Sequence, residues 1–189
     1  EILPGTELQI NFNGSLGGLM ALAGGHADIA GCHLWDPDTN AYNLAFIRKL
    51  FPNQKMAAVR LADRRLGWIV APGNPHQITR LEDIAKPGLR FVNRQSGSGT
   101  RVWLDGALQR VHLDVQNITG YADEKSTHSD VARLVAEGKA DVGLGLEASA
   151  AAFRLDFVFL VEEAYDLVLP AENLIQPPLQ TLATWLGSE

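Results

Sequence analysis

One short stretch of this 189-residue chain has the residue types to bind an anion. Arg94 and Arg101 flank a run of small residues between the apolar run 89–92 and an amphipathic helix predicted over 102–111. The small residues are Ser96, Gly97, Ser98, Gly99 and Thr100. Such a strand-to-helix turn exposes backbone N–H groups, and the helix dipole favours negative charge there. The stretch therefore predicts an anion site, and the alternative is an ordinary turn in which Ser98 only caps the helix.

The same loop lacks the signatures of two common chemistries. A phosphate-binding P-loop ends in Gly-Lys followed by Ser or Thr, and this loop has no lysine. A nucleophile elbow has glycines two residues before and after its serine, which neither Ser96 nor Ser98 has. His33, His128 and Glu147 are candidate bases, but no spacing links them to a nucleophile. We therefore expect recognition and no catalytic residue.

Two other predicted helices also begin at polar residues. Ser15 starts the first, and it is either an N-cap or a ligand contact. Thr127 and His128 precede a helix predicted over 129–137, where capping is a sufficient role for Thr127. His128 is either a neutral hydrogen-bond donor to an oxyanion or a plain surface histidine. Ligands of α/β sheets bind at the carboxyl ends of strands, so the three turns predict one shared cleft.

Two further side chains are candidates for that cleft. His33 follows a buried stretch, and we expect it to line the cleft rather than to bind a metal, because no second Cys/His cluster has zinc-like spacing. Glu147 follows the strand predicted over 142–146. A carboxylate would repel an anion unless an arginine neutralised it, so we expect Glu147 to pair with Arg94 or Arg101. No metal and no cofactor are expected.

The apolar patterns predict alternating strands and helices. Strands are expected over 8–12, 27–32, 56–61, 66–71, 89–92, 118–121, 142–146, 157–161 and 165–169. Helices are expected over 16–23, 45–51, 81–85, 102–111, 129–137, 147–153 and 178–186. This alternation favours βαβ units and mainly parallel sheets.

Composition excludes several classes of protein. Apolar residues make up 46% of the chain, enough for a core, but no apolar run reaches the length of about 18 that a membrane span needs. A net charge of −6 argues against a nucleic-acid surface. The single Cys32 excludes an internal disulfide and favours a reducing compartment. The chain starts at Glu1 without a signal-peptide pattern, so we expect a piece of a longer protein.

Taken together, these motifs resemble the periplasmic-binding-protein-like domain of type II. This domain is often joined to a helix-turn-helix, and it occurs in proteins named for molybdopterin biosynthesis or LysR-type substrate binding. The resemblance covers almost the whole chain and is more specific for the domain than for a ligand. The segments that carry it are 14–22, 27–31, 33–37, 66–75, 91–101 and 140–145.

The resemblance implies an α/β fold of two lobes with mainly parallel sheets, joined by crossover strands near 65–71 and 161–168. Lobe one would comprise 1–64 plus 162–189, and lobe two 65–161. Domains of this kind usually have a strand and a helix before the segment that matches 8–12, and both are missing here. We therefore expect an unpaired strand edge in lobe one, which would favour a homodimer.

Relatives of this fold bind molybdate or tungstate through hydroxyls and backbone amides. Ser15, Ser96, Ser98 and Thr100 match that chemistry, to which Arg94 and Arg101 would be additions. The resemblance thus implies a non-enzymatic binding domain for a small oxyanion, with molybdate or tungstate as the first candidates.

The expected role is the cytoplasmic sensor of a transcriptional regulator, linked to a helix-turn-helix domain. One alternative is a transport receptor for the same anion, periplasmic or lipid-anchored outside the cytoplasm. Another is an enzyme acting on a phosphorylated or carboxylated metabolite in molybdenum-cofactor assembly. In none of these readings does the segment itself contact nucleic acid or a membrane.

Overall fold

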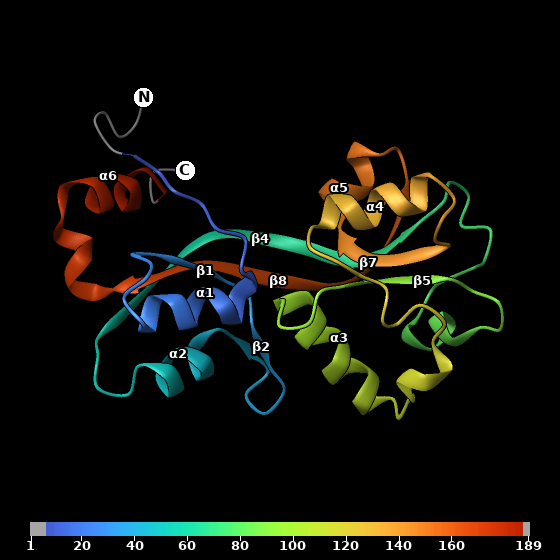
Figure 1. Ribbon diagram of the computed structural model, residues 1–189, viewed down its shortest axis with the longest axis horizontal. Coiled ribbons are helices and arrows are strands. Elements are labelled where there is room, and N and C mark those ends of the chain that lie inside the picture. The colour runs from blue at the N-terminus through green and yellow to red at the C-terminus, as the bar shows by residue number, and fades with distance from the viewer. Residues whose placement is uncertain (1–6, 187–189) are drawn as a thin grey trace. The chain divides into compact units, whose positions relative to one another are not determined.

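The computed structural model describes residues 7–186, which fold into two compact units (Figure 1). Unit 1 comprises Glu1–Asp63 and Ala164–Glu189, and unit 2 comprises Arg64–Glu163. The chain passes between the units twice, inside the long strands β4 (Met56–Val70) and β8 (Asp156–Pro170). No helix of the described part is long and apolar enough to cross a membrane.

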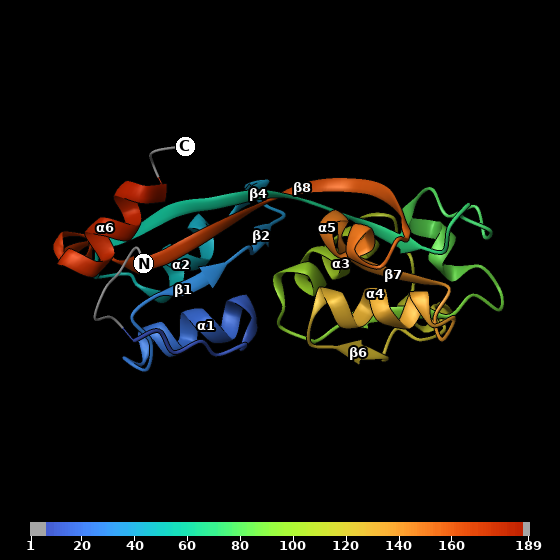
Figure 2. The same ribbon diagram turned by 90° about the horizontal axis from the view of Figure 1, so that it is seen from above.

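Unit 1 is built on three neighbouring strands in the order β1-β8-β4. Its own elements are α1 (Gly14–Ala23), β1 (Ala30–Cys32), β2 (Trp35–Asp36), β3 (Ala41–Tyr42), α2 (Leu44–Leu50), the 3-10 helix η3 (Ala171–Ile175) and α6 (Pro177–Leu186). β1 runs antiparallel to β8, with Ala30 opposite Val168, and β2 and β3 form a small antiparallel pair. Figure 2 shows α1 beside β1, and Gly18 of the helix faces the side chain of Ala30.

A buried polar network holds the middle of unit 1 together. Asn43 is fully buried and has a positive φ of 66°. Its Oδ1 accepts the N–H of Leu34 at 2.7 Å, while its Nδ2 donates to the carbonyl of Cys32 at 3.2 Å and to Oδ2 of Asp166 at 2.7 Å. Arg60 Nε donates to the other carboxylate oxygen of Asp166 at 2.6 Å. One amide thus connects β1, the loop after it and β8.

Unit 2 is a four-stranded sheet in the order β4-β7-β5-β6. Its own elements are η1 (Leu81–Ala85), β5 (Phe91–Arg94), α3 (Gly99–Arg110), η2 (Val115–Asn117), β6 (Glu124–Lys125), α4 (His128–Ala136), β7 (Val142–Leu146) and α5 (Glu147–Ala152). β5 runs parallel to β6 and β7, whereas β7 runs antiparallel to β4.

The two faces of this sheet are covered by different helices. α4 and α5 lie on one face, and α3 lies on the other (Figure 1). On the α4 side, Ile69 and Val92 pack with Val131 and Val135 of α4. Trp68 and Phe91, one residue earlier on their strands, point to the opposite face and meet edge-to-face at 6.0 Å. The packing of helices on both faces of the sheet positions the turns at the ends of β5 and β6.

The α/β fold class is confirmed, and the sheet is mixed. Parallel pairing holds around β5, while the strands that join the units pair antiparallel with β1 and β7. The four separate strands predicted over 56–61, 66–71, 157–161 and 165–169 are only two, β4 and β8. Charged residues in their middles interrupt the apolar pattern but leave the backbone extended, since side-chain type does not prevent ladder bonds.

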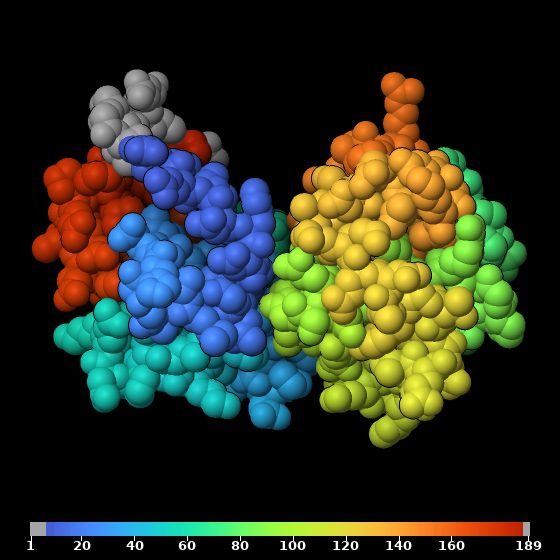
Figure 3. All heavy atoms as spheres, in the orientation of Figure 1, coloured from blue at the N-terminus to red at the C-terminus, as the bar shows by residue number. Residues whose placement is uncertain are grey.

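The strand predicted over 8–12 is wrong for this structure. Residues 7–13 form no regular element, and Leu8, Ile10 and Phe12 are 77%, 64% and 81% exposed. The space-filling view shows this segment, in dark blue, on the surface (Figure 3). A strand needs a neighbour for its N–H and C=O groups, and no strand of the described residues pairs with this segment. Alternation alone therefore does not make it a strand.

The strand predicted over 118–121 is also wrong, because the chain turns there and the short strand β6 follows it. Gly120 has a φ of 90°, a backbone conformation outside the extended region. Its backbone also approaches the carbonyl of Phe91 so closely that a Cβ would clash with it. The glycine brings the chain beside β5 before pairing begins at Glu124.

Candidate anion-binding site

The turn between β5 and α3 forms the centre of the candidate site. Ser98 is the N-cap of α3: its Oγ accepts the N–H of Arg101 at 3.2 Å and donates to the carbonyl of Gln95 at 2.8 Å. Gly97 turns the chain with a φ of 80°. The first helical N–H groups, those of Gly99 and Thr100, have no acceptor within the helix. Ser98 therefore acts as the cap, and the two N–H groups beyond it remain for an anion.

Arg94, at the end of β5, is a buried cation with two fixed hydrogen bonds. It is 7% exposed, and it donates from Nε to the carbonyl of Lys125 at 3.3 Å and from Nη2 to that of Ser126 at 2.9 Å. Its Nη1 has no hydrogen-bond partner among residues 7–186. Burial lowers the pKa of Arg94 to about 10. The side chain thus ties the β5 turn to the β6–α4 turn and keeps one nitrogen unused.

Thr100 presents a second unused polar atom on the same turn. The residue is fully buried, and its Oγ1 has no partner in the described part of the chain. Buried polar atoms in folded proteins are almost always hydrogen-bonded, so each exception needs an explanation. A guanidinium nitrogen, a hydroxyl and two helical N–H groups on one turn together suit a negatively charged ligand.

The carboxylates near Arg94 are paired with other arginines. Glu163 is 1% exposed and pairs with Arg64, whose Nη2 lies 2.5 Å from Oε1. The pKa of Arg94 is raised by Glu163 and Asp130 and lowered by Arg64. Asp130 in turn pairs with Arg133, so neither carboxylate forms an ion pair with Arg94 among the described residues. A buried cation without an ion-pair partner is unfavourable, and an anion would supply one.

Arg101, the second arginine of the motif, is engaged by the fold. Nε donates to Asp105 at 2.8 Å, Nη1 donates to Glu124 at 2.8 Å, and the guanidinium stacks on the ring of Tyr121 at 4.2 Å. Tyr121 donates its hydroxyl to the same Asp105. The second oxygen of Glu124 accepts the N–H of Ser96 at 3.1 Å. This arrangement holds the outer part of the loop and already uses the N–H of Ser96.

At the start of α4, the predicted residues have structural contacts. Thr127 is the N-cap: its Oγ1 accepts the N–H of Asp130 at 3.0 Å and donates to the Asp130 carboxylate at 2.7 Å. His128 is half-buried and lies beside β7, where a Cβ on Gly145 would come within 3.5 Å of its Nδ1. The imidazole thus lies in van der Waals range of β7.

The expected pairing of Glu147 with Arg94 or Arg101 is wrong. Arg65 Nη1 donates to both of its carboxylate oxygens, at 2.7 and 2.9 Å. The register explains this pair, because Leu66 of β4 stands opposite Leu146 of β7 and places their neighbours side by side. Arg65 also lies over the ring of Phe159 at 4.8 Å.

Ser15 and His33 form a separate group in unit 1. Ser15 is 1% exposed, and its Oγ accepts the N–H of His33 at 3.2 Å. The N-cap position of α1 is Asn13, so Ser15 is not the cap. The imidazole of His33 lies 5.6 Å from the ring of Tyr165. The structure therefore brings these two predicted residues together.

Sequence reasoning missed three charged residues of unit 2. Glu163 lies in β8 beside Glu162, and nothing in the sequence distinguishes the buried carboxylate from its exposed neighbour. Its partner Arg64 lies in a polar stretch that shows no signal either. Glu124 lies outside every predicted element, and its contact with Ser96 depends on the pairing of β5 with β6.

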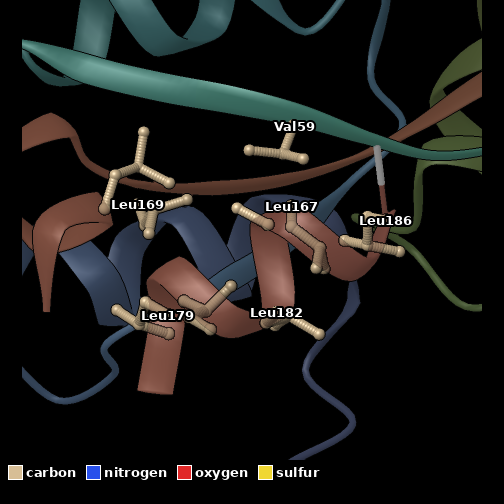
Figure 4. Close-up of a pocket in the computed structure, with 9 residues that line it drawn as sticks. Val59, Leu167, Leu169, Leu179, Leu182 and Leu186 are labelled. Carbon is tan, nitrogen blue, oxygen red and sulfur yellow. The ribbon is translucent and has the colours of Figure 1, made fainter. Parts of the chain in front are cut away.

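A small apolar cavity lies elsewhere, between α6 and the sheet of unit 1 (Figure 4). Its volume of about 10 Å³ suits at most one water. The labelled side chains around it are all aliphatic: Val59, Leu167, Leu169, Leu179, Leu182 and Leu186. This lining offers no donor to an anion. Over 7–186, no cluster of three or more His, Cys, Asp or Glu side chains could hold a metal ion.

Comparison with known proteins identifies the family. The model of the PBP superfamily domain, described as PBP-like, matches residues 1–187. The chain belongs to this family. Its members include periplasmic-binding-protein-like domains, so the resemblance seen in the sequence motifs is confirmed.

Two curated relatives share about a third of their aligned residues with this PBP-like chain. The "Uncharacterized protein YvgK" of Bacillus subtilis (strain 168) is 32% identical over 162 residues, which are 86% of this chain and 53% of that protein. A Clostridium pasteurianum protein from the 5' region of a 2Fe-2S ferredoxin gene is 32% identical over 88 residues, 46% of this chain and 78% of its own length. The chain thus spans about half the length of the Bacillus relative.

Solved structures of several binding domains share the fold. The regulatory domain of Synechocystis CcmR, in complex with 2-PG, has a TM-score of 0.66 at 13% identity, covering 92% of this chain and 78% of that one. A putative phosphate-binding transport protein from Clostridium perfringens, with bound phosphate, has a TM-score of 0.66 at 16% identity, covering 98% and 83%. The effector domain of QuiR, in complex with shikimate, has a TM-score of 0.63 at 14% identity, covering 92% and 76%. These similarities confirm the type II periplasmic-binding-protein-like fold.

Proposed function

We propose that this chain is a non-enzymatic binding domain for a small oxyanion, and that unit 2 supplies the main donors. The observation that carries the proposal is the pair of buried, unpartnered atoms on the β5–α3 turn, Arg94 Nη1 and Thr100 Oγ1. The first N–H groups of α3 lie on the same turn. A bound anion would satisfy these donors and give the buried Arg94 an ion-pair partner.

The bonds of Arg94 leave Nη1 as its nitrogen without a partner. Nε and Nη2 each donate to one backbone carbonyl, which fixes the direction in which Nη1 can donate to a ligand. A tetrahedral oxyanion accepts single bonds from several directions and suits such a set of donors. Molybdate and tungstate are our first candidates.

The relatives support two roles for such a domain. The CcmR regulatory domain in complex with 2-PG and the QuiR effector-binding domain in complex with shikimate support the first role, and we favour the sensor part of a transcriptional regulator. That role implies a linked helix-turn-helix domain and a cytoplasmic location. The phosphate-binding protein of Clostridium perfringens supports the second candidate, a transport receptor outside the cytoplasm. In either role, the division into lobes 1–64 plus 162–189 and 65–161 would provide the two halves of a closing domain.

Calorimetric titration with molybdate, tungstate, sulfate and phosphate tests the proposal. We expect a saturable heat and a thermal shift with at least one of these four anions. Tetrahedral anions of different size separate the candidates, because a fixed set of donors prefers one radius. An absence of heat and of thermal shift with all four would refute oxyanion binding.

Replacing each arginine separately tests which one binds the ligand. Arg94→Gln removes the free Nη1 and the positive charge beside the turn, so we expect anion affinity to fall at least about ten-fold, or about 1.4 kcal/mol. Arg101→Gln is the matched control, since its partners are Asp105, Glu124 and Tyr121. We expect it to lower the melting temperature and to change affinity by less than about three-fold. The opposite pattern would transfer the ligand contact to Arg101.

A further inference from the structure

Glu124 places a carboxylate directly against the anion loop. Its Oε2 accepts the N–H of Ser96 at 3.1 Å, and its Oε1 accepts from Arg101 Nη1 at 2.8 Å. A side-chain carboxylate therefore accepts one backbone N–H of this turn, that of Ser96. The N–H groups of Gly99 and Thr100 on the same turn remain for a ligand. The bond from Ser96 to Glu124 is the type of bond that an anionic ligand would make with such a loop.

The ion pair with Arg101 does not neutralise this carboxylate fully. Arg101 also pairs with Asp105, so one positive charge faces two negative charges. The residual negative charge lies at the rim of the loop, because Glu124 is about one third exposed. Arg101, Asp105 and Glu124 thus form a cluster with a net negative charge. This cluster adjoins the same β5–α3 turn as the positively charged Arg94.

We propose that Glu124 is a specificity-determining residue, which weakens anion binding at the β5–α3 turn in proportion to the charge of the ligand. The inference rests on the proposed oxyanion site. A like charge near a binding site raises the free energy of the bound anion by a Coulomb term that doubles from a monoanion to a dianion. Glu124 therefore lowers the affinity for dianions more than the affinity for monoanions. The preference of the site for dianions over monoanions becomes smaller as a result.

Glu124→Gln is the variant that removes this charge and retains an acceptor for the N–H of Ser96. Tungstate and perrhenate are suitable probes, because both are tetrahedral oxyanions of similar size that differ by one charge. We expect Glu124→Gln to strengthen perrhenate binding about three-fold and tungstate binding about ten-fold, a typical size for one charge at a partly exposed site. Because salt screens such a term, the gain should shrink when the titration is repeated at about 1 M NaCl.

Asp105→Asn is the matched control. It makes the same change of charge in the same cluster, but Asp105 accepts from Arg101 and Tyr121 and bonds no N–H of the loop. We expect a smaller gain in affinity than in Glu124→Gln and a larger loss of thermal stability. Equal gains in the two variants would assign the effect to the general field of the cluster and overturn the specific role of Glu124.

Two other outcomes separate this inference from the proposed function. If wild-type protein binds tungstate and Glu124→Gln binds it equally or more weakly, Glu124 only holds the loop and the inference fails. If neither protein binds tungstate, perrhenate, molybdate, sulfate or phosphate, the oxyanion site itself is refuted. A gain that is larger for tungstate than for perrhenate, and that salt reduces, supports the inference.

Discussion

Arg94 and Arg101 show how identical side chains in one motif acquire different roles. Both flank the same small-residue loop, yet Arg94 donates to two carbonyls and keeps Nη1, whereas Arg101 meets two carboxylates and an aromatic ring. A guanidinium paired with two carboxylates has little left to offer an anion. The residue chemistry of the site thus depends on what surrounds each arginine, not on its type.

Asn43 is the side chain in unit 1 whose removal should destabilise the protein most clearly. Its amide connects Leu34, Cys32 and Asp166, and it is fully buried. We expect Asn43→Ala to lower the free energy of unfolding by about 3 kcal/mol, since it leaves buried polar groups unpaired. Urea unfolding followed by circular dichroism measures the change.

Asn40→Ala is the control for that variant. Asn40 also has a positive φ, of 50°, but it is exposed and accepts one 3.3 Å bond from the Trp35 indole. We expect a loss of about 1 kcal/mol or less, because water can replace the lost partner. Similar losses for both variants would point to backbone strain as the common cause and not to the buried network.

The thiol of Cys32 should be inert while the protein is folded. Cys32 is fully buried in β1, and burial raises the pKa of its thiol to about 12. The thiolate is the reactive form, so at pH 8 we expect native protein to react with Ellman's reagent at least about 100-fold more slowly than protein in urea. Rapid labelling of native protein would instead mean that β1 opens readily.

At the scale of elements, short contacts between helix and strand decide where α4 lies. Gly143 in β7 lets α4 lie directly against the sheet, because a Cβ there would clash with Val131 of α4 and come within 2.9 Å of Val92. Gly145 makes room for Ile69 of β4, which a Cβ would meet at 2.6 Å. The position of α4 therefore depends on a missing side chain as well as on the side chains present.

Gly143→Ala tests this positioning. The added methyl forces α4 away from β7 or distorts Val92, and we expect a loss of about 1–3 kcal/mol in the free energy of unfolding. If the oxyanion site is correct, anion affinity should also fall, because α4 and β5 move apart. Differential scanning calorimetry and anion titration on the same sample measure both effects.

Gly18→Ala is the matched control within helix α1. The new Cβ there would lie 3.5 Å from that of Ala30, an ordinary contact, and alanine favours helix more than glycine does. We expect unchanged or slightly raised stability. Destabilisation of similar size in both variants would contradict the packing argument for β7.

At the scale of the whole molecule, the proposed donors belong to unit 2, whereas Ser15 and His33 belong to unit 1. A ligand that binds the folded state stabilises it by about 2.7 kcal/mol at a concentration 100 times its Kd. Hydrogen exchange should then slow most over 95–101 and 126–131 when tungstate is added. Slowing confined to α2 and α6 of unit 1, with no change in these two segments, would place the ligand elsewhere.

Local patterns predicted much of the fold. Helices α1 to α6 lie close to their predicted ranges, because helical periodicity and capping are properties of neighbouring residues. The continuity of β4 and β8, each predicted as two strands, and the irregular backbone over 8–12 and 118–121 were less predictable. A strand exists only where another strand accepts its hydrogen bonds, and that partner is distant in the sequence.

The sequence by itself determined the family, the order of helices and the small-residue loop that begins α3, since each is recorded in adjacent residues. Only the tertiary structure decided which atoms of that loop remain unused. Lys125, Ser126 and Glu124 reach it through the pairing of β5 with β6, and Asp105 and Tyr121 reach Arg101 across α3. Hydrogen bonds and ion pairs form between atoms that meet in space, so no spacing along the chain could show that Arg94 keeps a free, buried nitrogen while Arg101 pairs with two carboxylates.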